Sequence, residues 1–252
     1  MRSLTSHDAI IYHTNDFHNH LLPEQAERLR ALRADLGSGG LFLDAGDAVS
    51  SGNVTYHAGG EPILETMSDI GYDAMTVGNR EFHFTRAGFF AKLSKARFPI
   101  LCANVRSRSE GTDGSLPVVD HIRTVVESGL RITVFGLTVP MITQKMLVRK
   151  VSAYVFEDPI RTAGSLVPVL RTECDMLICL SHIGIAKDRE LAARVNGIDL
   201  IIGGHSHVTL PEGERVGETL ITQAGWWGRS LGTVTVTMRQ GGPVLSANIE
   251  PL

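Results

Sequence analysis

The chain has 252 residues, and 43% of them are hydrophobic, so it can bury a full core as one large domain or two small ones. Its formal net charge of -3 and its pI near 6.4 provide neither a basic stripe for nucleic acid nor a polybasic anchor for a membrane. No apolar stretch before the first expected strand is long enough for a signal peptide or a membrane span. We therefore expect a single cytoplasmic domain over residues 1–252, with a small molecule as its partner.

Short apolar runs alternate with helical periodicity along most of the chain. In chain order, the sequence predicts a strand at 9–12, a helix at 24–36, a strand at 41–44, a helix at 62–70, a strand at 73–77, a helix at 86–96, a strand at 100–103, a hairpin of 122–127 with 131–137, a helix at 158–174, a strand at 176–181, a helix at 187–195, a strand at 199–203 and a hairpin of 231–238 with 244–249. This pattern favours an α/β (α+β) fold in which two mixed sheets pack face to face with helices outside.

Polar motifs follow directly after several of the expected strands. They are Asp16-x-His18, Gly46-Asp47, Gly78-Asn79-Arg80-Glu81, Ser181-His182 and Gly203-Gly204-His205-Ser206-His207. The carboxyl ends of strands in an open α/β sheet are where ligands bind, so these motifs are expected to converge. Each motif alone is common and usually marks a turn or a strand end, but their recurrence in this position predicts one metal site.

The side chains in these motifs that can ligate a metal are Asp16, His18, Asp47, Asn79, His182, His205 and His207. Carboxylate, amide and imidazole ligands without a thiolate suit Mn, Fe, Zn or Co. The set is too large for one tetrahedral ion and fits two divalent ions about 3.5–4 Å apart, with Asp47 as the bridging carboxylate. Such a site keeps a surplus of positive charge and binds anions, which indicates hydrolysis of a phosphate ester by a metal-bridging hydroxide.

With these residues in view, the chain resembles the calcineurin-like metallophosphoesterase superfamily, specifically the catalytic domain of the bacterial 5′-nucleotidase family. Further motifs carry the resemblance, among them His13-Thr14-Asn15-Asp16, Gly60-Glu61-Pro62, Ala103-Asn104-Val105, Phe156-Glu157-Asp158-Pro159 and Gly228-Arg229-Ser230-Leu231-Gly232. The resemblance implies a four-layer αββα sandwich and a phosphomonoesterase that acts in nucleotide breakdown. It also implies that Asp16, His18, Asp47 and His207 hold one metal, while Asp47, Asn79, His182 and His205 hold the other.

One departure from the family pattern concerns acid catalysis. The family usually reads Gly-Asn-His-Glu-Phe-Asp where this chain reads Gly78-Asn79-Arg80-Glu81-Phe82-His83. Arg80 can hold a phosphate oxygen through two parallel N–H bonds, but an arginine does not donate a proton near neutral pH. We hypothesise that His83 supplies the proton, because i, i+3 side chains share a helical face. The alternative is a histidine that only caps or solvates the loop.

A second departure concerns length. Members of this nucleotidase family usually carry a further C-terminal domain whose aromatic residues clamp the base, whereas here nothing follows Leu252, so that domain is expected to be absent. Trp226 and Trp227 are then the candidates for a substrate platform. The alternative is that they pack against a neighbouring loop or a second copy of the chain, which leaves an oligomer open.

Two other functions stay open on the sequence. The same fold would support a phosphodiesterase or a hydrolase of another tetrahedral oxyanion ester. The replaced histidine and the missing domain also allow a non-catalytic module that binds metal or nucleotide, although such a module would have little need for both metal sites.

Overall fold

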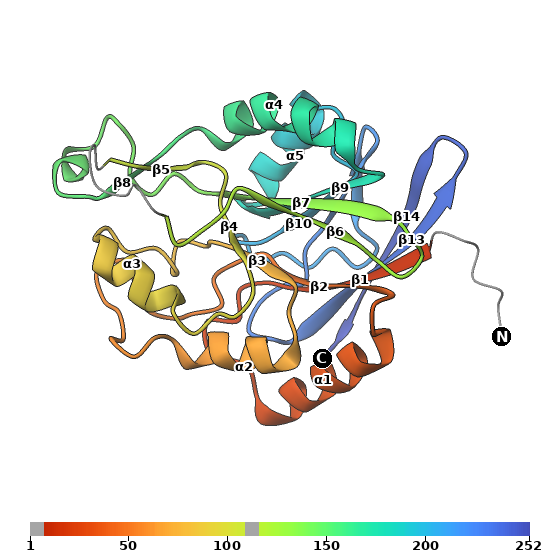
Figure 1. Ribbon diagram of the computed structural model, residues 1–252, viewed down its shortest axis with the longest axis horizontal. Helices are drawn as coiled ribbons and strands as arrows, with labels where there is room; N and C mark the ends of the chain where they lie inside the picture. The colour runs from red at the N-terminus through yellow and green to blue at the C-terminus, as the bar shows by residue number, and fades with distance from the viewer. Residues whose placement is uncertain (1–7, 109–115) are drawn as a thin grey trace.

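The computed structural model describes residues 8–108 and 116–252 (Figure 1). The first elements are β1 (Asp8–Thr14), α1 (Pro23–Leu36), β2 (Gly40–Asp44), α2 (Pro62–Ile70), β3 (Ala74–Thr76), α3 (Arg86–Leu93), β4 (Ile100–Leu101), β5 (Val105–Ser107), β6 (His121–Val125) and β7 (Arg131–Thr138). They are followed by η1 (Leu147–Lys150), β8 (Tyr154–Phe156), α4 (Pro159–Leu170), η2 (Arg171–Glu173), β9 (Met176–His182), α5 (Ile185–Arg194), β10 (Leu200–Gly203), β11 (Glu214–Val216), β12 (Thr219–Thr222), β13 (Ser230–Arg239) and β14 (Gly242–Pro251).

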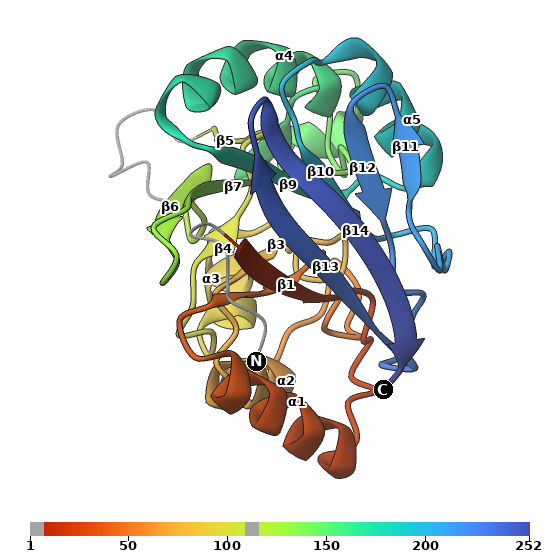
Figure 2. The same cartoon turned by 90° about the vertical axis from the view of Figure 1, so that its right-hand side faces the viewer.

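Two six-stranded mixed sheets form the centre of the molecule. The first has the order β14-β13-β1-β2-β3-β4, in which β1 to β4 run parallel and β13, paired with β14 in a hairpin, is antiparallel to β1. The second has the order β11-β12-β10-β9-β7-β6, with a parallel centre and an antiparallel strand at each edge. Figure 2 shows the long β13–β14 hairpin crossing the molecule diagonally. Both predicted hairpins are confirmed.

Separate apolar clusters fill the three spaces between the layers. Leu29 of α1 and Leu64 of α2 pack on the first sheet. Leu43 of β2 and Ile178 of β9 belong to the cluster between the sheets. Leu191 of α5 packs on the second sheet together with residues of α4. The helices therefore cover the two outer faces, α1 and α2 below and α4 and α5 above in Figure 1, and the predicted four-layer αββα sandwich is confirmed.

Local signals fix where several helices begin. The Asp158 carboxylate accepts a hydrogen bond from the backbone N–H of Arg161 at 2.8 Å and so caps the start of α4. Proline occupies the first turn of α1, α2 and α4, where its missing N–H leaves no hydrogen bond unmade. Gly71 ends α2 with a φ of 94°, a conformation that glycine adopts readily.

Short elements account for most differences from the predicted pattern. Strands β5, β8, β11 and β12 have three or four residues each and gave no separate periodic signal. The predicted helix 158–174 ends at Leu170 and continues as the 3-10 turn η2, while α3 ends at Leu93 rather than at residue 96. Helix ends depend on tertiary packing and are poorly marked in sequence. Within the described residues, no helix is long and apolar enough to cross a membrane.

Candidate metal centre

The predicted ligands lie on loops at the carboxyl ends of parallel strands in both sheets. In the first sheet, Asp16 and His18 follow β1, Asp47 follows β2, and Asn79 follows β3. In the second sheet, His182 is the last residue of β9, and His205 and His207 follow β10. The polar side chains therefore meet where the two sheets present the same end of their parallel strands.

One group of ligand atoms surrounds Asp16. Its Oδ1 lies 3.4 Å from His18 Nε2 and 3.2 Å from His207 Nε2, and these three side chains offer ligand atoms within 4.8 Å of one another. His18 Nε2 also lies 3.6 Å from Asp47 Oδ2. The four side chains are the set that the family resemblance assigned to one ion.

A second group of ligand atoms surrounds the other oxygen of Asp47. Asp47 Oδ1 lies 3.5 Å from His182 Nε2. The rings of His182 and His205 are 5.1 Å apart, and His205 Nδ1 lies 3.0 Å from Asn79 Oδ1. The two oxygens of Asp47 thus face different groups, as those of a bridging carboxylate do. Asp16 also offers a ligand atom within 4.8 Å of Asp47 and His182, so it faces both groups.

Backbone strain is concentrated at this cluster. In the described part of the chain, the non-glycine residues with positive φ are Asp16, His18, Asn19, Asp47, His205, His207 and Trp227, with φ between 50° and 72°. Each such conformation costs on the order of 1–3 kcal/mol and persists only where the surroundings impose it. Hydrogen bonds from Asp16 N to Gly46 O (2.9 Å) and from His18 N to Asp47 O (3.0 Å) hold the two loops in this form. Strain at most of the predicted ligands indicates a functional site.

The donor set fits a metal. Asp16 Oδ1, His18 Nε2 and His182 Nε2 are buried and have no hydrogen-bond partner among the described residues. An unpaired buried polar atom destabilises the fold by about 1–3 kcal/mol, and divalent cations at the two groups would coordinate these atoms. Carboxylate, amide and imidazole donors match the preferences of Mn, Fe, Zn or Co.

The electrostatics of the cluster favour bound positive charge. Burial lowers the pKa of His182, but the Asp47 carboxylate beside it outweighs burial and raises the pKa to about 10. Burial also lowers the pKa of His18, yet Asp16 and Asp47 raise it to about 9. In turn, these imidazoles hold the pKa of both carboxyl groups well below the usual range, against the effect of burial. A cation bound here would displace the protons, because an imidazole must be neutral to ligate.

Glu81 supports the loop that carries Asp47. Its buried carboxylate accepts hydrogen bonds from the backbone N–H groups of Asp47 (2.9 Å), Val49 (3.1 Å) and Gly78 (2.8 Å). A Cβ atom at Gly78 would lie 2.2 Å from Asp47 Oδ1, so only glycine lets the two loops approach this closely. Glu81 was not among the predicted site residues, although its motif contains two of them.

Two further contacts orient the ligands. His182 Nδ1 is hydrogen-bonded to Ala45 O at 2.7 Å, which directs Nε2 toward Asp47. The Asn15 amide donates to Asp16 Oδ2 at 2.8 Å and to Gly225 O at 2.6 Å. Asn15 therefore joins the loop after β1 to the loop that carries the tryptophans. Its position next to Asp16 in the sequence did not predict this role.

Arg80 lies against the cluster. Its backbone N–H donates to Asp47 Oδ1 at 2.7 Å, and its Nη1 donates to Ser50 O at 2.8 Å. Its Nε lies 3.5 Å from Asp47 Oδ2 and has no hydrogen-bond acceptor among the described residues. One N–H of Nη1 is thus used within the protein, while Nε is a donor next to Asp47, and the pair of parallel bonds to a phosphate stays a prediction.

A buried lysine holds the segment that carries Arg80. Lys92 of α3 has no exposed surface, and its Nζ donates to Arg80 O at 2.6 Å and to Gly52 O at 2.8 Å, with Ser51 O and Phe82 O at 3.4 and 3.3 Å. The loop after β2 and the loop after β3 are thus tied to the same cation. No sequence motif identified Lys92.

The structure contradicts the helical geometry that placed His83 beside Arg80. None of residues 79–85 is helical, and α3 begins only at Arg86, so positions 80 and 83 share no helical face. The cause is the Glu81 carboxylate, which folds this segment back onto the Asp47 loop.

His83 instead packs at the start of α3. It is 3% exposed, and its Nδ1 accepts a hydrogen bond from Thr85 N at 3.1 Å and lies 2.9 Å from Thr85 Oγ1. A backbone hydrogen bond joins the ring to Val54, and burial lowers its pKa. A Cβ atom at Gly88 would lie 2.2 Å from His83 Nδ1, so this glycine leaves room for the ring. These contacts match the alternative interpretation of His83 as a residue that secures the loop.

The tryptophans contact a predicted ligand. Trp226 stacks on His207 with ring centroids 5.0 Å apart, and Trp227 contacts both Trp226 (4.0 Å) and His20 (4.5 Å). The guanidinium of Arg229 lies 5.1 and 5.2 Å from the two indole rings. Both indoles are partly exposed, so they border the metal cluster and also support one of its ligands.

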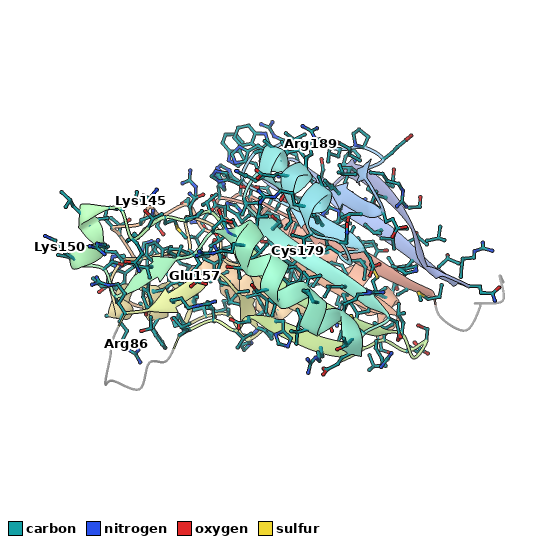
Figure 3. The ribbon with its side chains drawn as sticks, turned by 90° about the horizontal axis from the view of Figure 1, so that it is seen from above. Arg86, Lys145, Lys150, Glu157, Cys179 and Arg189 are labelled. Carbon is teal, nitrogen blue, oxygen red and sulfur yellow. The ribbon has the colours of Figure 1, made fainter. Side chains whose placement is uncertain are left out.

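A cavity lies away from the predicted ligands. It measures about 1020 Å³ and is lined by Arg106, Lys145, Glu157 and Arg161 among others, and by none of the predicted ligands. Figure 3 shows Lys145 and Glu157 toward the end of the molecule opposite the β13–β14 hairpin. We place the functional site at the cluster because strain, unpaired buried atoms and perturbed pKa values coincide there and not in this cavity.

An αββα sandwich with carboxylate and imidazole ligands at its strand ends defines a class of metal-binding hydrolases. A sequence model of the calcineurin-like phosphoesterase family matches residues 10–209, and the chain belongs to this family. It is similar to a trifunctional nucleotide phosphoesterase protein of Bacillus subtilis (strain 168), with 32% identity over 94% of this chain and 18% of the relative, and to the 5′-nucleotidase of Mus musculus, with 29% identity over 96% of this chain and 48% of the relative. Among solved structures, the 5′-nucleotidase precursor of Thermus thermophilus superposes with a TM-score of 0.79 and 26% identity over 98% of this chain and 55% of that one.

The chain thus spans about half of the mouse 5′-nucleotidase and 18% of the Bacillus relative. The family match covers the segment that contains all the predicted ligands and ends before the tryptophans. Family membership therefore bears on the metal cluster, whereas the substrate has to be inferred from the site itself.

Proposed function

We propose that this chain is a hydrolase that binds two divalent metal ions and removes a terminal phosphoryl group from a small phosphate compound. The observation that carries the proposal is the placement of Asp47, whose Oδ2 faces His18 and whose Oδ1 faces His182. A carboxylate set between two groups of ligand atoms suits a pair of ions about 3.5–4 Å apart.

Each side chain has a definite task in this proposal. Asp16, His18, Asp47 and His207 would hold one ion, while Asp47, Asn79, His182 and His205 would hold the other. Bound metal ions would supply Lewis-acid activation of the phosphorus centre and of the attacking water. The unpaired Nε of Arg80 beside Asp47 would donate to a phosphate oxygen, and its positive charge would help to hold the anion.

For the substrate, we propose nucleotides as the first class to examine. The relatives include proteins named 5′-nucleotidase and nucleotide phosphoesterase. The partly exposed indole of Trp226 stands beside His207, where an edge or remaining face can meet a base attached to a phosphate bound at the metals. A small phosphate compound also agrees with the anionic net charge of the chain, which does not favour a nucleic acid.

The test is phosphate release by protein stripped of metal and then reloaded separately with Mn, Co, Zn or Mg. The panel contains nucleotides, sugar phosphates and nitrophenyl mono- and diesters. We expect turnover with at least one metal, a preference for monoesters or terminal phosphoryl groups over diesters, and loss of at least about 100-fold in Asp47→Asn.

The matched control is Asp69→Asn, which changes an exposed carboxylate paired with Arg97. It should keep its activity. Two ions bound per chain without turnover on any substrate would overturn the proposal and favour a binding role, and a diester preference would favour a phosphodiesterase.

A further inference from the structure

We propose that the cavity beside strands β5 and β8 is a second anion site, which binds the phosphate chain of a small polyphosphate, either free or carried by a nucleotide. The cavity measures about 1020 Å³, at the upper end of the range for small-molecule sites. None of the candidate metal ligands lines it, so the inference does not rest on the proposed hydrolase function. Figure 1 shows β5 and β8 at the end of the molecule away from the β13–β14 hairpin.

Positively charged side chains are in excess around this cavity. Four cations and two carboxylates line it, which leaves a surplus of two positive charges; these side chains are Arg106, Arg108, Lys145 and Arg161, and Glu157 and Asp158. The whole chain carries a formal net charge of -3, so the surplus is a local feature. A concave surface lined by one sign of charge concentrates ions of the opposite sign.

Both carboxylates of the cavity already have partners in the protein. Glu157 Oε2 pairs with Arg106 Nη2 at 2.9 Å, and the Asp158 carboxylate caps α4 through the backbone N–H of Arg161 at 2.8 Å. The Nη1 of Arg106 donates to two backbone carbonyls, both at 2.8 Å. Arg106 is therefore part of the wall, and the carboxylates are not paired with the other three cations.

Two of these cations have no partner in the part of the chain that the structure describes. The Lys145 ammonium and the Arg161 guanidinium make no hydrogen bond or ion pair there. Arg108 donates through Nη1 to Ser152 O at 3.1 Å, which leaves other N–H groups of its guanidinium for a ligand. Guanidinium and ammonium groups bind phosphate oxygens through charge-assisted hydrogen bonds. The available donors therefore suit an anion with several oxygen atoms.

The segments that carry the cations are held together by hydrogen bonds. Strand β5 pairs with β8, and Phe156 of β8 donates its N–H to Ile142 O at 2.8 Å, three residues before Lys145. The buried Asn104 amide donates to Glu157 O at 3.1 Å, next to the start of α4. Cations from β5, from the turn before η1 and from α4 thus surround a built cavity. A chain of phosphates can contact more of them than a single phosphate can.

The cavity offers contacts for charge rather than for a base. Among the described residues that line it, the one aromatic side chain is Phe156, which is 4% exposed. Stacking of a base needs an exposed aromatic face. We therefore expect inorganic triphosphate and a nucleoside triphosphate to bind with similar affinity, and the nucleoside alone not to bind.

The test is calorimetric titration of the full chain, kept free of metal by a chelator, with inorganic triphosphate. We expect one triphosphate per chain with a dissociation constant below about 1 mM, and weaker binding as salt is raised. Arg161→Gln and Lys145→Gln should each weaken binding by about tenfold, because each removes a charge-assisted contact. Lys150→Gln and Arg30→Gln change exposed cations that do not line the cavity, and as matched controls they should bind like the wild type.

Glu157→Gln gives a prediction of the opposite sign. The substitution removes a negative charge from the wall and frees Nη2 of Arg106 from its ion pair. We expect it to strengthen triphosphate binding by about threefold, because repulsion of the phosphates falls. Damage to the fold would only weaken binding, so a gain in affinity identifies the electrostatic effect.

The remaining outcomes decide between sites and sources. A nucleoside triphosphate that binds more tightly than triphosphate, with the same losses in Arg161→Gln and Lys145→Gln, would support the site and identify a nucleotide as its ligand. No binding of triphosphate at about 1 mM would overturn the inference, as would binding that both substitutions leave unchanged. Loss of binding in Arg80→Gln alone would place the anion at the metal cluster and overturn it too. Since no metal is present and no turnover is measured, failure of the hydrolase proposal leaves this result intact.

Discussion

At the scale of single residues, Asp188 of α5 places a fully buried carboxyl group against the second sheet. Its carboxyl group accepts a hydrogen bond from the hydroxyl of Ser181, the residue before the candidate ligand His182. Burial raises the pKa of Asp188 from 3.8 to about 7. Between these two values the unfolded chain has lost a proton that the folded protein still holds. The contribution of Asp188 to stability is therefore present at low pH and is lost as the pH rises toward 7.

Asp188→Asn should remove this pH dependence, because an amide still accepts the Ser181 bond and never ionises. We expect the free energy of unfolding of the variant, relative to wild type, to increase between pH 4 and pH 7 by up to about 1.4 kcal/mol per pH unit. This difference in the free energy of unfolding is measured by urea unfolding of chelator-treated wild type and variant at several pH values. Asp35→Asn, at an exposed position of α1, is the control and should follow the wild type. A difference in the free energy of unfolding between Asp188→Asn and wild type that stays constant across the pH range would contradict the raised pKa of Asp188.

The sequence predicted that the candidate ligands lie together, which the structure shows, but it did not predict their backbone conformation. Asp16, His18 and Asp47 stood out because their types and spacing suit a cation after a strand. Their positive φ values depend on hydrogen bonds between the β1 and β2 loops, which are distant in the chain. The misplacement of His83 has the same origin, since the Glu81 carboxylate draws its segment out of helical geometry through contacts more than thirty positions apart in sequence.

At the scale of elements, α3 contributes more to the site than its amphipathic pattern indicated. The sequence predicted the helix and its beginning at Arg86, because Thr85 is a good cap and its hydroxyl accepts from Gly88 N at 3.2 Å. The helical pattern gave no role to Lys92. In the structure it is buried beneath the loops after β2 and β3 and neutralises their carbonyl dipoles. Pairing between distant loops has no local sequence signal, which is also why the β5–β8 ladder was missed.

The substitution Lys92→Met tests whether Lys92 stabilises the loops after β2 and β3. The methionine keeps the length of the side chain but leaves the carbonyls of Gly52 and Arg80 without their donor. We expect a loss of about 2–4 kcal/mol in the free energy of unfolding, measured with urea. Lys95→Met is the matched control, since Lys95 is partly exposed and pairs with Glu65 at the surface, so it should cost less than about 1 kcal/mol. Equal effects of the two substitutions would show that Lys92 gives no special support.

At the scale of the whole molecule, the cluster joins the two sheets. The first sheet provides Asp16, His18, Asp47 and Asn79, and the second provides His182, His205 and His207. Periodicity predicted two mixed sheets packed face to face, their hairpins and the helices outside, because burial imposes regular apolar spacing on long elements. The four-layer αββα sandwich came from the family resemblance, and strand order was not predicted because it depends on contacts between distant segments.

Metal binding should therefore stabilise the entire sandwich. At a free metal concentration about 100 times the dissociation constant, we expect a gain of about 2.7 kcal/mol in the free energy of unfolding, which appears as a higher Tm in calorimetry. A chelator should reverse the gain, and Asp47→Asn should abolish most of it. A Tm that does not respond to Mn, Co or Zn would mean that the folded chain binds these ions no better than the unfolded chain.

Because Trp226 contacts His207, tryptophan fluorescence should report on the metal cluster. The sequence contains two tryptophans, which stack on each other beside this ligand. Indole emission responds to charge within a few ångströms, and binding of a cation at the neighbouring imidazole changes that charge. The chain has no third tryptophan that would add background emission. Intrinsic fluorescence of the unlabelled protein, measured without substrate, should therefore report in real time whether the metal position at Asp16 and His207 is filled.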